Sequence, residues 1–388
     1  MRQRKLALAL VLALVAQLFF VPLAQAQGLK VEGKGAILIE AAGGDVLFAQ
    51  DEDTKWYPAS VTKVMTLLLA LEAVKEGRAS LEDKVVTSEH AAGYGGSQVW
   101  LEPGETFTLR EMLLAVAVGS ANDASVAVAE HLAGSEEAFV EQMNKKAREL
   151  GALNTHFVNS HGLHHPDHYT TARDTALIAR YAVQHVPEIL DFTRVKEYTF
   201  REKPKLILYN TNKLLWWYPG TAGLKTGTTP EAGRSLVTFA ERDGLQLISV
   251  VLGVGKPRGH FTESMKLLNY GFAQYQWQPL YEAGQRLGVV PVSKGAAASV
   301  AALAEEKVGL AVPKGSKAKV EAEVELLPWI EAPVQTGQAL GAVVLRRDGR
   351  EVKRIPLIAA TDVPRATLWQ ETGKVFQRLL VAGNSGKI

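Results

Sequence analysis

A serine and a lysine stand three positions apart in the stretch Tyr57-Pro58-Ala59-Ser60-Val61-Thr62-Lys63-Val64-Met65-Thr66. Pro58 suits the first position of a helix, and the apolar residues after Lys63 continue a helical pattern to near Gly77. Ser60 and Lys63 are three positions apart, so their side chains share one helix face, with Cβ atoms about 5–6 Å apart. A neutral lysine amine at that spacing can take the proton of a serine hydroxyl and make it a nucleophile.

Two further motifs favour an active-site role for Ser60 and Lys63. Ser-x-x-Lys alone is weak evidence, since the same spacing recurs at Ser316 and Lys319 in a Lys- and Gly-rich run. Ser120-Ala121-Asn122, however, lies between two helical segments, and Lys225-Thr226-Gly227-Thr228 lies on a predicted strand. The three motifs in this order match the set found in penicillin-interacting serine enzymes.

Composition excludes several classes of protein. The 388 residues include 43 Lys and Arg against 41 Asp and Glu, so no electrostatic argument favours a nucleic-acid partner. The chain has no cysteine, which rules out disulfide bonds, a thiol nucleophile and a thiolate metal site. The length allows two domains, and their stability must come from ordinary apolar cores.

The first residues have the pattern of an export signal. A basic start is followed by an apolar run from residue 6 to 21 and by the small-residue site Ala24-Gln25-Ala26. We therefore predict a signal peptide at residues 1–26, and hence an exported mature chain. No later segment has eighteen uninterrupted apolar residues, so the mature chain is not predicted to span a bilayer.

The rest of the chain predicts an α+β fold, with helices packed on an antiparallel sheet and a small all-β domain after them. A hairpin is predicted at residues 36–49 and strands at 223–228, 235–240 and 245–252. Helices are predicted at residues 109–118, 124–132, 135–150 and 261–274, besides the one that follows Ser60. We assign the catalytic domain to residues 27–276 and a β-sandwich domain to residues 277–362, where short β-like runs alternate with Gly, Pro and Lys turns.

Residues 363–388 are predicted to form an amphipathic tail. Its apolar residues fall on one helix face, and its cations suit anionic lipid headgroups. The apolar residues are Leu368, Trp369, Val375, Phe376, Leu379 and Leu380, and the cations are Arg365, Lys374, Arg378 and Lys387. The alternative is a helix packed on the β domain, and Gly373 in mid-segment weakens a long helix of either kind.

With these motifs in place, the chain resembles the D-alanyl-D-alanine carboxypeptidases, the low-molecular-mass penicillin-binding proteins. The resemblance covers nearly all of residues 30–275. Besides the three motifs it includes Gly96-Ser97-Gln98, Leu101-Glu102-Pro103-Gly104-Glu105, Asn159-Ser160-His161-Gly162-Leu163, Asn212-Lys213-Leu214-Leu215 and Leu267-Leu268-Asn269-Tyr270-Gly271-Phe272. It implies a β-lactamase/transpeptidase-like catalytic domain and a serine-type carboxypeptidase that removes the terminal D-alanine from peptidoglycan pentapeptide stems.

The resemblance also implies catalytic roles. Ser60 would attack the carbonyl between two D-alanines and form an acyl-enzyme, with Lys63 as the general base. Burial and the nearby charge of Lys225 would both lower the pKa of Lys63 and keep it neutral. Ser120 would relay the proton to the departing nitrogen, and Asn122 would hydrogen-bond the substrate peptide.

Substrate-binding roles follow from the same resemblance. Lys225, Thr226 and Thr228 would hold the terminal carboxylate, while Gly227 would let the substrate lie close to the strand. The backbone N–H groups of Ser60 and Thr228 would form the oxyanion hole.

One position departs from the family pattern. Where relatives are expected to carry an arginine for the substrate carboxylate, this chain has His260, with Arg258 two residues earlier as a possible substitute. Since histidine titrates near neutrality, we expect carboxylate binding to weaken above about pH 6.5 and His260→Arg to flatten that dependence.

The sequence also has to be weighed against four alternatives: a metal site, a class A β-lactamase, a D,D-endopeptidase and a non-catalytic penicillin sensor. His161, His164, His165 and His168 with Asp167 look like a metal cluster, but the resemblance accounts for His161 and His168 without metal, and we predict neither metal nor cofactor.

A class A β-lactamase would need Glu-x-x-x-Asn between the second and third motifs, and no glutamate from residue 130 to 202 fits. A D,D-endopeptidase acting on cross-links uses the same residues and stays open. A non-catalytic penicillin sensor would be expected to lack Lys63 or Ser120.

The expected partners are therefore stem peptides ending in D-Ala-D-Ala, β-lactam antibiotics as acylating inhibitors, and an anionic membrane surface that residues 364–388 contact. The expected location is the outer face of the cytoplasmic membrane, or the medium if the protein is secreted.

Overall fold

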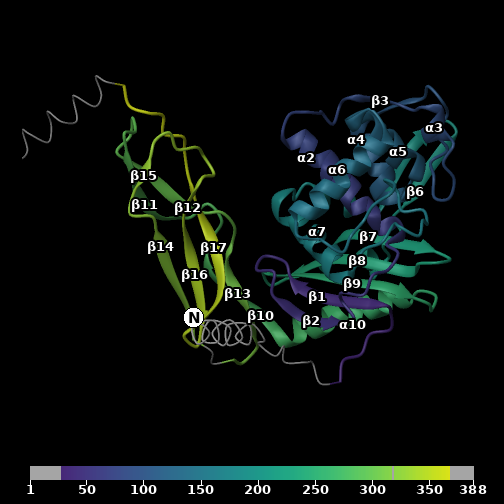
Figure 1. The fold of residues 1–388 in the computed structure, drawn as a ribbon. Coiled ribbons are helices and arrows are strands. Elements are labelled where there is room, and N and C mark those ends of the chain that lie inside the picture. Colours follow the sequence, from purple (N-terminus) through teal and green to yellow (C-terminus); the bar gives the residue numbers. More distant parts are fainter. Residues whose placement is uncertain (1–27, 317–318, 368–388) are drawn as a thin grey trace, which may run out of the picture.

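The computed structural model describes residues 28–316 and 319–367. Figure 1 shows two bodies, a helix-rich one up to helix α10 and an all-β one after it. The predicted signal peptide and residues 368–388 of the predicted tail lie outside the described residues. No helix within the described ranges is both long and apolar enough to cross a membrane.

The catalytic domain is built on a five-stranded sheet in the order β2-β1-β9-β8-β7, with every neighbouring pair antiparallel. The strands are β1 (Gly35–Glu40), β2 (Val46–Gln50), β7 (Thr221–Thr229), β8 (Gly233–Arg242) and β9 (Leu245–Val254). This confirms the predicted antiparallel sheet, and it leaves β7 at an edge with one side free to pair.

Helices cover both faces of the sheet, because alternate residues of its strands point to opposite sides. Ile37 of β1 joins the core under the larger helical layer, whereas Leu38 joins the core under α10. The larger layer contains α2 (Lys63–Lys75), α4 (Leu109–Leu114), α5 (Asn122–Ala133), α6 (Glu136–Glu149), α7 (Ala172–His185) and α8 (Ile189–Thr193), and the opposite face carries α10 (Gly259–Gln274).

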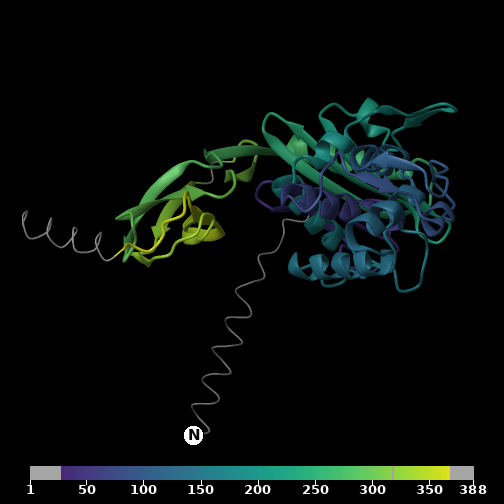
Figure 2. The same cartoon turned by 90° about the horizontal axis from the view of Figure 1, so that it is seen from above.

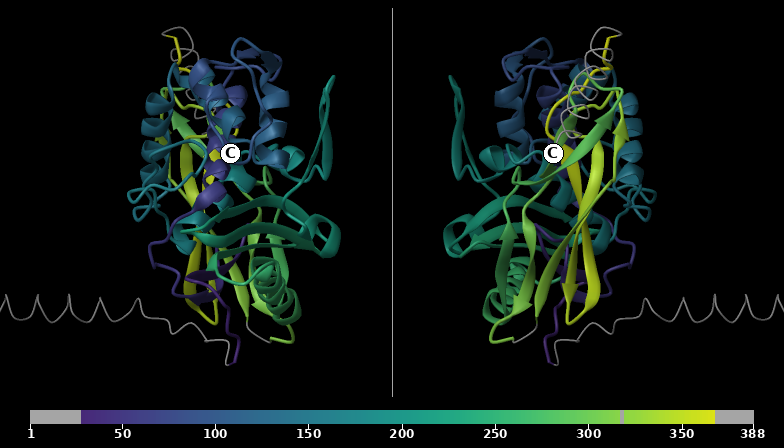
Figure 3. Two further views of the ribbon diagram at one scale, coloured as in Figure 1. Left: turned by 90° about the vertical axis from the view of Figure 1, so that its right-hand side faces the viewer. Right: turned by 90° about the vertical axis from the view of Figure 1, so that its left-hand side faces the viewer.

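Shorter elements complete this domain. They are α3 (Glu89–Ala92), α9 (Leu214–Trp217), β3 (Lys84–Val86), β4 (Thr106–Thr108), β5 (Glu197–Glu202) and β6 (Lys205–Tyr209). Strands β5 and β6 form a hairpin that projects from the domain (Figure 3). Arg201 ties this hairpin to the loop before β4, with its guanidinium donating to Glu105 Oε1 at 2.8 Å and to the carbonyl of Val99 at 2.8 Å.

The C-terminal domain begins at β10 (Tyr275–Tyr281), which pairs with β13 (Val308–Pro313). A six-stranded sheet follows the order β14-β16-β17-β12-β11-β15. Its strands are β11 (Arg286–Ser293), β12 (Ser299–Ala304), β14 (Val320–Leu326), β15 (Ile330–Glu331), β16 (Ala339–Arg347) and β17 (Arg350–Ala359). An apolar core joins β13 to the larger sheet, as in the predicted all-β domain. Figure 2 shows this domain extending away from the catalytic one.

Charged side chains connect the two domains. Arg180 of α7 donates to the carbonyl of Ala41 at 2.8 Å and to Glu306 of the β domain at 3.2 Å. Lys353 of β17 also reaches Glu306, at 3.4 Å. Beside them, burial raises the pKa of Glu40 to about 7, despite hydrogen bonds from the backbone of residues 42 and 43.

Two helix predictions differ from the structure in detail. Pro58 precedes a 3₁₀ turn, η1 (Ala59–Thr62), and the α-helix itself starts only at Lys63, because Ala59 has a positive φ of 48°. The helix predicted at residues 109–118 ends as a π-helical turn, η2 (Ala115–Gly119). Residue patterns of period 3.6 do not distinguish these variants from an α-helix.

Candidate active site

The Ser60–Lys63 pair lies at the junction of η1 and α2. Lys63 Nζ lies 3.1 Å from Ser60 Oγ, within hydrogen-bonding distance. The two residues are three positions apart, as predicted, although Ser60 is on the 3₁₀ turn and only Lys63 is on the α-helix. Ser60 is partly exposed at the surface of the site, whereas Lys63 is fully buried behind it.

The surroundings of Lys63 favour its neutral amine. Burial lowers its pKa well below the ordinary value, the charge of Lys225 lowers it further, and only Asp123 opposes them. Its Nζ donates to Asn122 Oδ1 at 2.7 Å and to the carbonyl oxygen of His161 at 2.6 Å. A neutral amine has two hydrogens, which these two acceptors use, so its lone pair remains for the hydroxyl proton of Ser60. This is the protonation state that a general base needs.

Ser120 and Asn122 stand where the π-turn η2 meets α5. Ser120 has a left-handed backbone with φ 60° and is 4% exposed, so the chain turns sharply there before α5 begins. Two hydrogen bonds hold Asn122 in place. Its Nδ2 donates to the carbonyl oxygen of Gly95 at 2.7 Å, and its backbone N–H donates to the carbonyl oxygen of Ser97 at 2.7 Å. The structure thus joins Asn122 to Lys63 directly. Within the described residues the hydroxyl of Ser120 makes no hydrogen bond.

Strand β7 forms the facing wall. Lys225 is buried, and this burial lowers its pKa to about 7. Thr226 Oγ1 donates to Thr211 Oγ1 at 2.6 Å, and Thr228 is exposed. A Cβ atom on Gly227 would lie 2.6 Å from the carbonyl oxygen of Pro58 and 3.1 Å from the nitrogen of Ser60. Only glycine therefore lets β7 approach the nucleophile so closely.

His260 lies at the start of α10 and differs from the expectation. It is 6% exposed, and its pKa is lowered to about 4, first by burial and then by the charge of Arg234. The imidazole is therefore neutral at neutral pH, and the predicted loss of its charge above pH 6.5 is wrong. Arg258, the suggested substitute, is exposed.

The clustered histidines do not converge on one point. His161 and His168 are buried, with pKa values lowered to about 2 and about 3 mainly by burial, whereas His164 and His165 are exposed. Across the described ranges, no group of three or more His, Asp or Glu side chains has the arrangement of a metal site. His168 instead supports the nucleophile: its Nδ1 accepts from the N–H of Val158, and its Nε2 lies 2.7 Å from Thr62 Oγ1.

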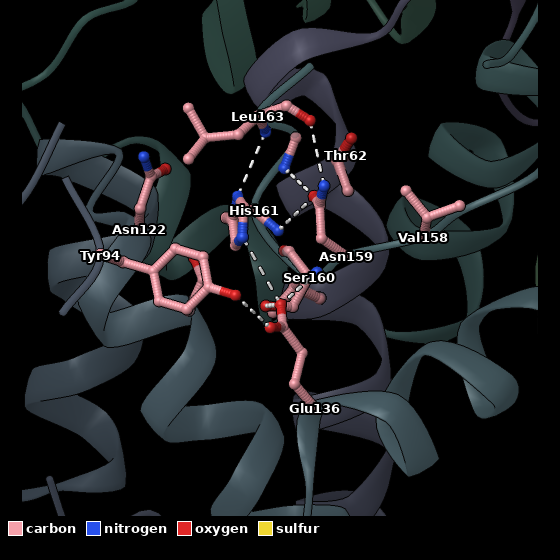
Figure 4. A network of polar contacts seen from close by, with 12 residues as sticks. Thr62, Tyr94, Asn122, Glu136, Val158, Asn159, Ser160, His161 and Leu163 are labelled. Carbon is pink, nitrogen blue, oxygen red and sulfur yellow. Dashed lines mark hydrogen bonds and ion pairs between the residues drawn. The ribbon is translucent and has the colours of Figure 1, made fainter. Parts of the chain in front are cut away.

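A polar network behind Lys63 was missed at the level of sequence (Figure 4). Glu136 Oε1 accepts from the N–H of Ser160 at 2.9 Å and from its hydroxyl at 2.7 Å, and Glu136 Oε2 accepts from the hydroxyl of Tyr94 at 3.0 Å. The next residue, His161, supplies the carbonyl that accepts from Lys63. Ser135 and Glu136 were interpretable only as a helix start, which they also form.

The tautomer of His161 follows from its contacts. Its Nδ1 accepts from the N–H of Leu163 at 3.1 Å, so the proton of the neutral ring is on Nε2. That nitrogen faces Glu136 Oε1 at 3.6 Å, too far for a normal hydrogen bond. All the polar hydrogens around Glu136 thus point at its carboxylate, and this orients the turn that contains His161.

A serine hydroxyl beside a buried neutral lysine is the arrangement of serine enzymes in which lysine serves as the base. The comparisons make the class specific. Residues 22–256 match the D-alanyl-D-alanine carboxypeptidase family, and residues 275–365 match the C-terminal domain of penicillin-binding protein 5. The chain belongs to the D-alanyl-D-alanine carboxypeptidase family.

Individual relatives agree with this assignment. The chain is 42% identical to the D-alanyl-D-alanine carboxypeptidase DacF of Bacillus subtilis over 338 residues, 86% of this chain and 87% of the relative. Penicillin-binding protein 5 of Haemophilus influenzae has a similar structure, with a TM-score of 0.70, 34% identity and coverage of 87% of this chain and 99% of that one. Ampicillin-bound penicillin-binding protein D2 of Listeria monocytogenes matches with a TM-score of 0.58 and 30% identity, over 63% of this chain and 99% of that one.

Proposed function

We propose that this protein is a serine D-alanyl-D-alanine carboxypeptidase that removes the terminal D-alanine from peptidoglycan pentapeptides. The observation that supports it most is the contact of Ser60 with Lys63, whose two amine hydrogens are used by Asn122 and His161. Family membership and the activity named for the relatives support the same conclusion.

In the proposed reaction, the proton of Ser60 moves to Lys63 as Oγ attacks the carbonyl carbon of the penultimate D-alanine. Backbone N–H groups of Ser60 and Thr228 would stabilise the oxyanion that forms. The carbon–nitrogen bond then breaks as Ser120 donates its proton to the departing D-alanine nitrogen and takes the proton held by Lys63, which leaves both Ser120 and Lys63 neutral. Water hydrolyses the ester, which gives the shortened stem as a carboxylate and restores the hydroxyl of Ser60.

Binding of β-lactam antibiotics is part of the same proposal. A β-lactam presents a strained amide to the same hydroxyl and would leave a slowly hydrolysed ester on Ser60. The ampicillin-bound relative supports this, because its fold matches 63% of this chain. The β-lactamase alternative stays disfavoured, since the sequence lacks the deacylating Glu-x-x-x-Asn.

Mass spectrometry of a muropeptide digest tests the activity. We expect the protein to remove one D-alanine from pentapeptides, and Ser60→Ala to abolish both this release and labelling by a fluorescent penicillin. Cleavage of cross-linked dimers without D-alanine release would favour the endopeptidase. Fast release of the penicillin label would favour a β-lactamase, and normal labelling of Ser60→Ala would refute the assigned nucleophile.

We also propose that the protein is exported and held at the outer face of the cytoplasmic membrane by residues 364–388. The pattern of apolar and cationic residues in this tail supports the proposal. Within the described part of the tail, Arg365 forms an isolated β-bridge with Gly295 of the β domain.

Flotation with anionic liposomes tests the anchor. The mature protein should float with the vesicles, and a form that ends at residue 363 should stay in solution. Neutral liposomes serve as the control for the contribution of the cations. Equal flotation of both forms would exclude the tail as the anchor.

A further inference from the structure

The groups predicted to bind the substrate carboxylate supply little permanent positive charge. The pKa of Lys225 is lowered to about 7 by burial, and that of His260 to about 4, so neither is a fixed cation at neutral pH. Arg258 is permanently charged, but it is exposed at the residue before α10. A terminal carboxylate would therefore lack a permanent cation if these were its partners.

Arg234 of β8 lies on the correct face of the sheet to supply that charge. It is the direct cross-strand partner of Thr228 in the antiparallel pair β7–β8, and such partners point to the same side. Because side chains alternate along a strand, Thr226 of β7 shares that side too.

The same side is the one that α10 covers. Thr238, four residues after Arg234 on β8, has its Oγ1 3.3 Å from the hydroxyl of Ser264 on α10. Leu236 of β8 packs in the same core cluster as Phe261 of α10. Arg234 thus projects at the end of the sheet where α10 begins, next to His260.

The guanidinium of Arg234 is held in place but not neutralised. One N–H, on Nη1, donates to the carbonyl of Gly255 at 2.9 Å, and no carboxylate in the described ranges pairs with the side chain. Its charge acts on the buried His260, so the two groups are close. A guanidinium has five N–H donors in a planar fork, and those left free match the two oxygens of a carboxylate.

We propose that Arg234 binds the terminal carboxylate of the substrate, together with Thr226 and Thr228. His260 then provides a neutral hydrogen-bonding group beside the carboxylate rather than its counter-charge. The inference rests on the proposed function and makes Arg234 a specificity-determining residue for that reaction.

The test compares a peptide ending in D-Ala-D-Ala with the same peptide as its C-terminal amide, which keeps the scissile bond but lacks the negative charge. We expect Arg234→Gln to lower kcat/KM for the free acid about tenfold or more, the usual scale for a hydrogen bond to a charged group. Hydrolysis of the amide should change less than twofold. Arg234→Lys should keep a larger share of activity on the acid than Arg234→Gln.

The control is Lys256→Gln, which removes an exposed cation from the loop between β9 and α10. It should leave the ratio of the two substrates unchanged, and thermal unfolding should show each variant folded. An equal loss on acid and amide in Arg234→Gln, or a selective loss in Arg258→Gln instead, would overturn the inference and leave the proposed function intact. If the unaltered protein released D-alanine from neither peptide, the proposed function would fail and the inference with it.

Discussion

The two domains bury different kinds of side chain. The interior of the catalytic domain contains Lys63, Lys225, Asp123 and Glu136, besides many hydroxyl groups. In the β domain, the described side chains that are buried are all apolar. Burying polar groups costs free energy unless each finds partners, so a core made for stability alone avoids them. The buried charges around Ser60 are therefore explained by the chemistry of the site, and the β domain shows the kind of core that a fold without such chemistry needs.

One lysine from each domain gives the largest predicted effect. Lys63 touches the nucleophile, whereas Lys353 of the β domain pairs with Glu306 of the same domain and reaches the carbonyl of Ala42 in the catalytic domain at 3.5 Å. Lys63→Met should lower the rate of acylation by a penicillin at least ~10²-fold, the scale for loss of a positioned base. Lys353→Met should leave that rate unchanged, because it alters only the contact between domains.

The measurement is the second-order rate of labelling by a fluorescent penicillin on protein shown to be folded by thermal unfolding. Lys63→Met should not lower the unfolding midpoint, since it replaces a buried amine by an apolar side chain of similar length. An unchanged labelling rate in Lys63→Met would show that Lys63 is not the base. A slower rate in Lys353→Met would show that the domain contact affects the chemistry.

Protonation of histidine should affect the catalytic domain, because all nine histidines of the chain precede β10. The folded-state pKa of His168 is lowered to about 3 from an ordinary 6.5. Its contribution to stability is thus fully present above pH 6.5 and is lost as the pH falls towards 3, since only the unfolded chain takes up the proton. At pH 5 the loss is about 2 kcal/mol. Glu40, with its pKa raised to about 7, acts in the opposite direction between pH 7 and 4.5.

Comparing His168→Gln with the unaltered protein isolates this contribution. Between pH 7.5 and pH 5, the variant should lose about 2 kcal/mol less of its free energy of unfolding. Urea denaturation measures it, with the amplitude of saturating penicillin labelling as the signal of a folded catalytic domain. His164→Gln is the exposed control and should behave as the unaltered protein does. Equal behaviour of the two variants would disprove a role for buried histidine in acid sensitivity.

The smallest predicted effect concerns Glu136, which orients the turn behind Lys63. In Glu136→Gln one carboxylate oxygen becomes an NH2 group, so the side chain can no longer accept from both Tyr94 and Ser160, and the carbonyl of the neighbouring His161 should be less well fixed. We expect acylation to slow by about tenfold, comparable to the loss of one hydrogen bond to a charged group. The pH profile should shift as well, because Lys63 loses part of its fixed surroundings.

Glu137→Gln is the matched control, since its side chain is exposed on the same helical turn. It should leave the acylation rate and the pH profile unchanged. A Glu136→Gln variant with a lower unfolding midpoint but an unaltered rate and profile would assign Glu136 to stability alone.

Most of the fold could be predicted from local patterns. Strands were predicted at residues 223–228, 235–240 and 245–252, where apolar residues either alternate with polar ones or follow one another between clear turns. They are β7, β8 and β9 of the structure. The Ser60–Lys63 contact and the lowered pKa of Lys63 were predicted correctly, because both follow from short-range spacing and burial. The 3₁₀ turn and the π-turn were not, because they depend on backbone angles imposed by tertiary packing.

What the sequence could not supply were contacts between distant residues. Glu136 and Ser160 are 24 positions apart, and each has an ordinary local interpretation. Arg234 appears as one more surface cation until the register of β7 and β8 places it opposite Thr228. The pKa of His260 was wrongly expected near neutrality, since its burial becomes visible only when α10 is placed on the sheet.

The close approach of Gly227 to Pro58 and Ser60 has a consequence for drug escape. An enzyme can evade an inhibitor by enlarging a side chain that touches the drug and not the substrate. At residue 227 the site is lined by backbone atoms alone, and a side-chain carbon there would clash with the backbone of Pro58 and Ser60. Selection by a β-lactam therefore has no useful variation to act on at residue 227, and resistance would have to arise at the rim of the site or through the amount of protein made.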